Sequence, residues 1–221
     1  MKPKNSLSPA AVADQALAIV DAEGLEALTV RKVADAFGVT PMALYWHFAN
    51  KEALLDAVGD AVVAGLSVPD EDLGLEDYLR QAMTALVEVM REHPNATPLV
   101  PHRLMINETG RDLTESVLDK LAVAGFDVDK ASAIAQYALM ISMTLVTGEP
   151  GAETTVKPNE REEAMAAKLA LIQSLPQERY PRLRAAAPAM VACGDSDDYY
   201  AQGVDIFVAG VMADARTLNP A

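Results

Sequence analysis

The segment from Leu28 to Leu55, LTVRKVADAFGVTPMALYWHFANKEALL, constrains the fold of this chain more than any other part. Apolar residues recur at helical spacing over Val30–Phe37, and Gly38 follows where a helix ends in a left-handed residue. Thr40 and Pro41 then supply an N-cap and a first-turn proline for a second, short helix. Two helices joined by a tight glycine-containing turn predict a helix-turn-helix.

Three runs within this segment form a longer pattern: Ala34-x-x-x-Gly38-Val39, Leu44-Tyr45-Trp46-His47-Phe48 and Asn50-Lys51-x-x-Leu54-Leu55. The pattern resembles the DNA-binding head of the tetracycline-repressor family over roughly residues 10–60, which is far more specific than one short motif. A weaker likeness continues in Tyr78-Leu79-Arg80 and in Gly125-Phe126. The resemblance implies a transcriptional regulator whose second helix of the motif enters the major groove of an operator.

The resemblance also assigns residues to the DNA interface. Arg31 is the expected base reader, because a guanidinium fork can bind guanine with two hydrogen bonds. An apolar edge at the start of the second helix suits a thymine methyl group, and the aromatic, His and Lys donors suit phosphates. Trp46 has an alternative interpretation as a core aromatic, and Lys51 as a solvated charge. The residues expected to contact DNA are Arg31, Thr40, Pro41, Met42, Ala43, Tyr45, Trp46, His47 and Lys51.

Composition favours an all-α fold for the whole chain. Hydrophobic residues make up 51% of the 221 residues and aromatic residues only 5%, and no stretch alternates as a strand does. The chain breaks at Ser67-Val68-Pro69-Asp70. We therefore expect a three-helix helix-turn-helix DNA-binding domain over residues 1–66. A larger helical bundle for ligand binding and dimerisation is expected over residues 67–221.

The distribution of charge is compatible with DNA binding although the net charge is −14. Residues 1–51 hold five basic and five acidic residues, so the negative charge lies entirely in the remainder. A chain that binds a polyanion is expected to keep its acidic residues away from the contact surface. The sparse basic residues predict modest affinity for a single head.

The longest apolar helix is expected over Lys130–Thr147, and it has no charge from Ala131 to Gly148. It is short for a membrane span and contains several hydroxyl and amide side chains, so we interpret it as the centre of a bundle. No signal peptide is recognisable in residues 1–9. The single cysteine, Cys193, suits a reducing compartment, and we expect a cytoplasmic protein with no membrane partner.

Two helices, over residues 130–147 and 197–217, present more apolar surface than we expect one copy of the chain to cover. We expect a homodimer in which they form a four-helix bundle, and hence a near-palindromic double-stranded operator. The alternative is that both helices are covered within one chain. The predicted dimerisation stripe is Tyr200, Val204, Phe207, Val208 and Val211.

By resemblance, three segments surround an effector cavity. Methionine repacks easily and suits sites for bulky apolar molecules, although these methionines can equally fill core. Because the body is acidic, we expect a small-molecule effector that is apolar and neutral or cationic. The predicted ligand-binding residues are Met83, Leu86, Met90, His102, Met105, Gln136, Met140 and Thr144.

Metal, cofactor and enzyme interpretations find little support. Tetracycline repressors hold a drug-bound magnesium ion through a His and a Glu; His102 and Glu149 are the counterparts by type, but their spacing differs and we interpret them as surface residues. Asp195, Asp197 and Asp198 form a helix-cap cluster, and no phosphate-binding glycine loop is present. The prediction is a repressor released from DNA by a small molecule, with no metal or cofactor and no catalysis. The alternatives are a ligand-independent architectural protein and, more remotely, an enzyme with an appended helix-turn-helix.

Overall fold

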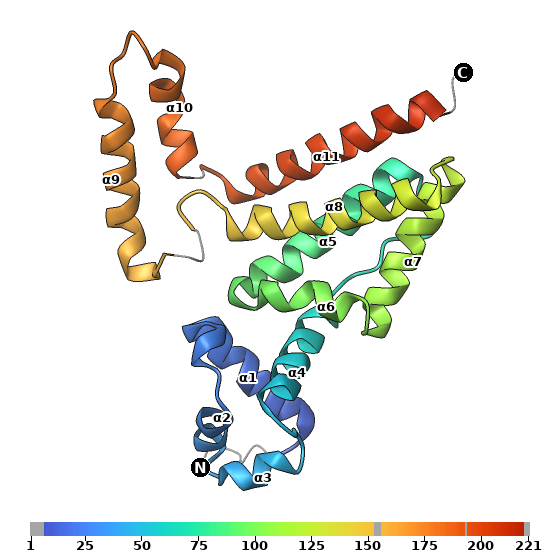
Figure 1. The fold of residues 1–221 in the computed structure, drawn as a ribbon, viewed down its shortest axis with the longest axis vertical. Coiled ribbons are helices and arrows are strands. Elements are labelled where there is room, and N and C mark those ends of the chain that lie inside the picture. Colours follow the sequence, from blue (N-terminus) through green and yellow to red (C-terminus); the bar gives the residue numbers. More distant parts are fainter. Residues whose placement is uncertain (1–6, 153–155, 193, 219–221) are drawn as a thin grey trace.

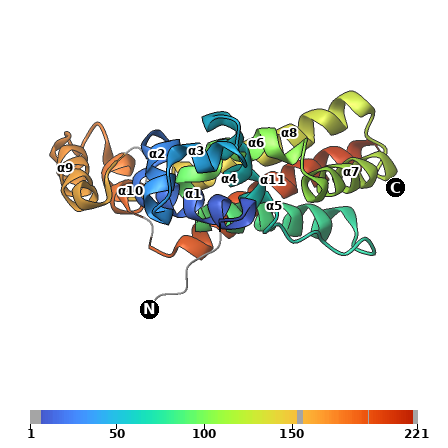
Figure 2. The same ribbon diagram turned by 90° about the horizontal axis from the view of Figure 1, so that it is seen from below.

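The computed structural model describes residues 7–152, 156–192 and 194–218. Over these ranges the chain consists of α-helices and three short 3-10 helices, without a strand, which confirms the predicted all-α class. Figure 1 shows a small helical head below a larger helical body, with a helical hairpin extending to one side. From below, that hairpin lies at one end of the molecule and α7 (Glu108–Val123) at the other (Figure 2).

The head is built on α1 (Pro9–Glu23), α2 (Val30–Phe37) and α3 (Pro41–Tyr45), with a 3-10 turn at Leu25–Ala27. Gly38 adopts the left-handed conformation at the end of α2, with φ of 66°, as its position in the sequence predicted. Val39 then donates its N–H to the Ala34 carbonyl over 3.0 Å, which closes the turn between the two helices. A shared core fixes their crossing, and its fully buried members are Val12, Ala16, Val20, Leu28, Val33, Ala34 and Leu44.

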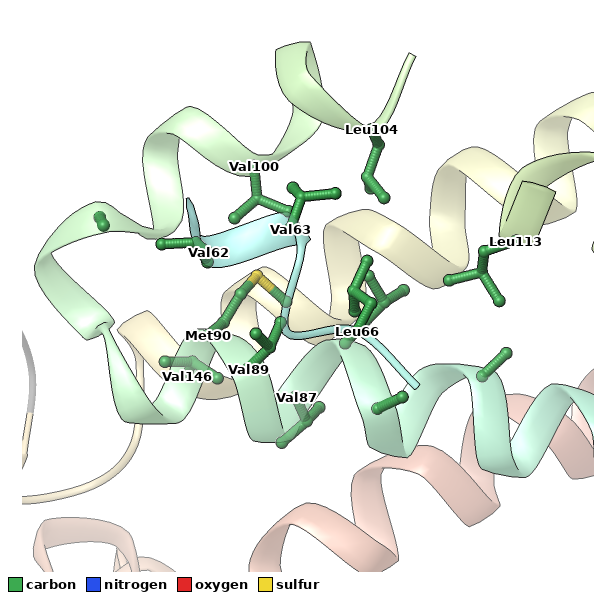
Figure 3. Close-up of a cluster of buried hydrophobic side chains, with 14 of the residues drawn as sticks. Val62, Val63, Leu66, Val87, Val89, Met90, Val100, Leu104, Leu113 and Val146 are labelled. Atoms are coloured by element: carbon green, nitrogen blue, oxygen red, sulfur yellow. The ribbon is translucent and has the colours of Figure 1, made fainter. Parts of the chain in front are cut away.

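Helix α4 (Lys51–Val63) connects the head to the body. Asn50 caps its first turn by accepting a hydrogen bond from the Ala53 N–H over 2.8 Å. Its last turn and the residues after it enter the body, where Val62 and Val63 lie close to Met90 and Val100 (Figure 3). Head and body therefore share one apolar cluster, and a boundary after residue 66 stays a prediction.

The body is organised around α5, which packs against α7, α8 and α11. Tyr78, Leu79, Met83 and Met90 of α5 are almost completely buried. The proline-rich segment after α5 forms only short helices, because its prolines interrupt a regular helix. The body elements are α5 (Leu75–Glu92), η2 (Pro94–Leu99), α6 (Val100–Leu104), α7 (Glu108–Val123), α8 (Val128–Thr147) and α11 (Ser196–Leu218).

Helix α8 packs against α5, α7, α11 and η2, but only one of its stripes is buried within the chain. One stripe is buried against α5 and α7, and its members are Ala131, Ile134, Ala138, Ser142 and Val146. The opposite stripe, with Tyr137 and Met140, is exposed. Within the described ranges, no helix combines the length and apolar character that crossing a bilayer requires.

The predicted dimerisation stripe on α11 is corrected for four of its five residues. Tyr200, Val204, Val208 and Val211 are buried inside the single chain, on the helix that packs against α5 and α8. Phe207 is half-buried against the same core. The alternative interpretation, that one chain covers this stripe, holds because α5 supplies the facing apolar surface. The solvent-facing side of α11 carries Ile206 instead.

The hairpin consists of α9 (Arg161–Ser174) and α10 (Pro181–Val191), preceded by a 3-10 turn at Pro158–Glu160. Its two helices pack chiefly against each other, and α9 has no buried residue. Pro176 lies between the two helices, and Pro181 is the first residue of α10, where a proline is tolerated.

Candidate DNA-binding surface and effector cavity

The short helix α3 divides its side chains cleanly between core and solvent. Leu44 is fully buried, and Phe48, just beyond the helix, is nearly so. Trp46 is 86% exposed, which is incompatible with the core interpretation of this aromatic. Met42 and Tyr45 are also exposed, so α3 presents a mixed apolar and aromatic face at the tip of the head (Figure 1).

Polar groups flank this face. Arg31 lies in the first turn of α2 with its side chain exposed, and its Nε lies 3.9 Å from Asp35 Oδ2, a loose pair on the helix surface. Thr40 precedes α3 as its N-cap residue without a side-chain hydrogen bond to the helix. Lys51, the first residue of α4, is half-buried, and His47 is exposed. All nine residues predicted to contact DNA therefore reach the surface, and their contacts with DNA stay a prediction.

The body encloses a cavity of about 330 Å³ between α5, α6, α7 and α8. Of the predicted ligand-binding residues, Met83, Leu86, Met105 and Gln136 line it. The lining contributed by each helix in chain order is Leu79, Ala82, Met83, Leu86, Pro101, Leu104, Met105, Leu113, Thr114, Val117, Ala135, Gln136, Ala138 and Leu139.

The other four predicted residues lie elsewhere. Met90 belongs to the apolar cluster shared by head and body (Figure 3). His102 is exposed on α6, and Met140 and Thr144 lie on the exposed stripe of α8, where Met140 is 60% exposed. Helix α8 instead turns Ala135, Ala138 and Leu139 towards the cavity. The prediction missed these three, the α7 residues, and also Leu79, Ala82, Pro101 and Leu104.

The cavity lining is almost entirely apolar. Its polar side chains are Thr114 and Gln136, and the Thr114 hydroxyl already donates to the Gly110 carbonyl over 2.8 Å. Gln136 and Met105 are exposed as well as lining the cavity, so the entrance lies between α8 and the end of α6. The lining includes no ionisable side chain. A ligand here would gain chiefly from burial of apolar surface, with the Gln136 amide as its directional partner.

Glu149 is part of a separate polar cluster at the junction of α5, α8 and α11. It accepts hydrogen bonds from the Tyr200 hydroxyl, over 2.7 Å, and from the Ser196 hydroxyl. Arg91 lies over the Tyr200 ring at 5.0 Å and pairs with Asp197, which raises the pKa of the Arg91 guanidinium. Burial raises the pKa of the Tyr200 hydroxyl, and the hydrogen bond to Glu149 raises it further. Neither His102 nor Glu149 lines the cavity, so the two residues form no metal site there. Within the described ranges, no group of three or more His, Cys, Asp or Glu side chains could hold a metal ion.

A helix-turn-helix head joined to a helical body with an apolar cavity defines a class of ligand-responsive regulators. Residues 12–58 match the model of the bacterial regulatory proteins of the tetR family. Residues 68–215 match that of the tetracyclin repressor-like C-terminal domain. The chain belongs to the tetR family.

Two similar relatives illustrate the range within the family. Tetracycline repressor protein class C of Escherichia coli is 34% identical over 146 residues, which cover 62% of this chain and 61% of that protein. The chain thus matches about three fifths of the length of that repressor. An HTH-type transcriptional regulator of Saccharopolyspora erythraea is 29% identical over 92% of this chain and 84% of that protein.

Solved structures share the fold at lower identity. ActR of Streptomyces coelicolor in complex with actinorhodin superimposes with a TM-score of 0.76 at 24% identity, covering 95% of this chain and 98% of ActR. Mycobacterium smegmatis BioQ has a TM-score of 0.64 at 22% identity, covering 94% of this chain and 99% of BioQ. These likenesses extend across both head and body.

Proposed function

We propose that this protein is a homodimeric, cytoplasmic transcriptional repressor that binds a near-palindromic DNA operator and is released from it by a small apolar molecule. The observation that carries the proposal is the coexistence, in one tetR-family chain, of an exposed helix-turn-helix face and an apolar cavity of about 330 Å³. An architectural DNA-binding protein has no use for such a cavity. The proposal assigns the chain no catalytic activity and no resident metal or cofactor.

DNA binding is assigned to the face around α3. The aromatic side chains there are exposed and lie outside the core of the head, as the 86% exposure of Trp46 illustrates. Phosphate contacts by Tyr45, Trp46 and Lys51 would fix the register, and Arg31 would read a base edge. Relatives are named as repressors, and BioQ has been crystallised with its double-stranded DNA operator.

The sequence predicted an apolar effector that is neutral or cationic, and the cavity favours a neutral one. An uncompensated charge inside a cavity without ionisable lining would lose its hydration without gaining a partner. A cationic ligand is therefore disfavoured, as is a drug bound as a metal chelate. The class that fits is a neutral, largely apolar molecule with an acceptor or donor for Gln136, on the scale of the cavity.

Dimerisation is assigned to a surface that replaces the stripe predicted from the sequence. Helices α8 and α11 pack against each other on the side of the body away from α3 (Figure 1). Their outward faces carry exposed apolar and small residues, namely Tyr137, Met140, Ile206, Ala209 and Gly210. Pairing this surface with itself about a twofold axis would bury it and hold two heads in one complex.

The interface is tested by Ile206→Glu, which places a charge on the proposed surface where the side chain is 69% exposed. Sedimentation should report a folded monomer. Val123→Glu, at another exposed apolar position at the end of α7, is the matched control and should remain dimeric. Equal assembly of both variants as dimers would contradict this interface.

Function is tested by selecting duplexes from a random pool and measuring their binding by fluorescence anisotropy. Recovery of near-palindromic sites bound far more tightly than bulk DNA is expected. Ala82→Phe should fill the cavity and abolish binding of Nile red, a neutral apolar dye, whereas Val123→Trp on the surface should not. Failure to enrich any duplex would contradict the proposed function.

A further inference from the structure

The two polar side chains that line the cavity differ in the hydrogen bonds they can still make. Gln136 is exposed at the entrance, and its amide can turn to present either a donor or an acceptor. Thr114 is half-buried on the wall formed by α7, where its neighbours on the cavity are the buried side chains of Leu113 and Val117. Its hydroxyl is therefore the polar group that α7 offers to a ligand.

The close packing of α7 against α6 determines where Thr114 lies. A Cβ at Gly110 would overlap the carbonyl oxygen of Leu104, so glycine is needed for the first turns of α7 to approach the end of α6 this closely. Leu104 itself lines the cavity, and Thr114 follows Gly110 by about one helical turn. The contact at Gly110 thus helps to hold the Thr114 side chain at the cavity.

The Thr114 hydroxyl has a single hydrogen, and this hydrogen is already engaged. It is donated to the Gly110 carbonyl over 2.8 Å, which leaves the hydroxyl oxygen free to accept. A ligand with a donor gains a hydrogen bond here without breaking one. A ligand with only an acceptor would have to take the hydrogen from Gly110, so it would exchange one bond for another with little net gain.

Packing alone does not require a hydroxyl at this position. Valine has nearly the same shape as threonine and would continue the apolar wall of Leu113 and Val117. A threonine inside a helix that bonds back to the preceding turn slightly destabilises the helix. A hydroxyl with a free acceptor on an otherwise apolar wall is therefore best explained by a ligand that bonds to it.

We propose that Thr114 selects the effector by accepting a hydrogen bond from it, so that the effector is a neutral, largely apolar molecule with a hydroxyl or N–H group directed at α7; this rests on the proposed function. Alcohols, phenols and amides that retain an N–H belong to this class. Ethers, esters and ketones of the same shape do not, because they lack the hydrogen. Gln136 adds affinity at the entrance without discriminating, since its amide matches either kind of group.

The test compares two probes that differ in one hydrogen-bond donor. 2-Naphthol carries a hydroxyl, 2-methoxynaphthalene carries a methyl group in place of that hydrogen, and both are uncharged at neutral pH. Their dissociation constants are measured by displacement of Nile red, after direct titration of the dye with each protein variant. The measured quantity is the ratio of the constant for the ether to that for the naphthol. Dividing the ratio of the parent protein by that of a variant cancels the different size and hydration of the probes.

The ratio of the parent protein should exceed that of Thr114→Val by about 2–12-fold, the range that one net hydrogen bond gives. Thr114→Ser retains the hydroxyl and should keep the parent ratio. Thr147→Val is the matched control, because the Thr147 hydroxyl donates to the Met143 carbonyl over 3.0 Å in the same way, but at the end of α8 and outside the cavity. Gln136→Leu should weaken binding of both probes together and leave the ratio unchanged.

The outcomes separate this proposal from the proposed function. If both probes bind and Thr114→Val keeps the parent ratio, Thr114 does not select the ligand, although the cavity still binds one. A fall of the ratio in Gln136→Leu alone would place the donor of the ligand at the entrance and would also overturn the proposal. If neither the dye nor the probes bind, the cavity is not an effector site and the proposed function itself fails. Thr114→Ala, which should lower the ratio as Thr114→Val does, keeps the test decisive if Thr114→Val does not fold.

Discussion

The head and the body place their large side chains in opposite ways around their proposed sites. In the head, Trp46 is exposed to solvent beside a buried Leu44, so the DNA-binding face and the core share a helix but no side chain. In the body, Leu79 and Met83 line the cavity and are also almost completely buried. Binding and stability are thus separable residue by residue in the head, whereas most residues lining the body cavity serve both.

The difference follows from what each region must bind. Duplex DNA is larger than the head and is met by side chains that project from its surface. A small apolar molecule is bound by being surrounded, which requires the side chains that would otherwise form the core.

The largest expected effect is on the stability of the head. Leu44→Ala should lower the free energy of unfolding by about 2–5 kcal/mol, because Leu44 is the fully buried side chain of α3. Its neighbour Trp46→Ala should change that free energy by less than about 0.5 kcal/mol and weaken DNA binding instead. Denaturant unfolding and anisotropy measure the two quantities. Comparable losses of stability in both variants would contradict the separation of DNA binding from stability in the head.

Arg31→Ala should have the next largest effect, on DNA binding alone. Loss of a bidentate base contact should cost about 1–3 kcal/mol on the selected duplex and relax the preference at one base pair. Stability should be nearly unchanged, because the Arg31 pair with Asp35 is loose and exposed. A uniform loss on all duplexes would assign Arg31 to a phosphate instead of a base.

The sequence predicted the head better than the body because its local patterns carry their own geometry. Gly38 fixes where α2 ends, and the spacing of Leu44 and Phe48 fixes which side of α3 is buried. Because Leu44 and Phe48 set the buried side of α3, Trp46 is placed on the exposed side, although an aromatic residue alone favours burial.

In the body, the spacing of apolar residues shows which face of a helix is buried but not which surface packs against it. Val204 and Val208 on α11 are buried as their spacing predicts, but against α5 of the same chain, and periodicity cannot distinguish that from a second copy. Helix α8 carries no charge from Ala131 onwards, so the sequence does not show which of its faces is buried. Leu139 faces the cavity and Met140 the solvent, and one residue along a helix separates them by about 100°.

In the body, the free energy of unfolding should depend on pH through the buried hydroxyl of Tyr200. The pKa of Tyr200 is raised in the folded state, first by burial and then by its hydrogen bond to Glu149. Above the ordinary tyrosine pKa of about 10, the unfolded state therefore loses this proton before the folded state does. The stabilisation is complete below that pH and is lost as the pH rises, by up to about 1.4 kcal/mol per pH unit. Tyr200→Phe should be less stable at neutral pH but should flatten this alkaline slope, and an unchanged slope would contradict the assignment.

The smallest expected effect returns to the head, where one phosphate contact can be removed without touching the core. Lys51 is the first residue of α4, whose first turn is capped by Asn50. A lysine at a helix N-terminus opposes the helix dipole, so Lys51→Ala should leave stability equal or slightly higher. DNA binding should weaken on all sequences alike, and the slope of log K against log salt should fall by about one, the value for one lost phosphate contact. Stability and affinity would then move in opposite directions at a single residue, which no cavity-lining core residue of the body is expected to allow. Unchanged binding of Lys51→Ala across a salt series would mean that Lys51 is a solvated charge and that the phosphates are held elsewhere on the head.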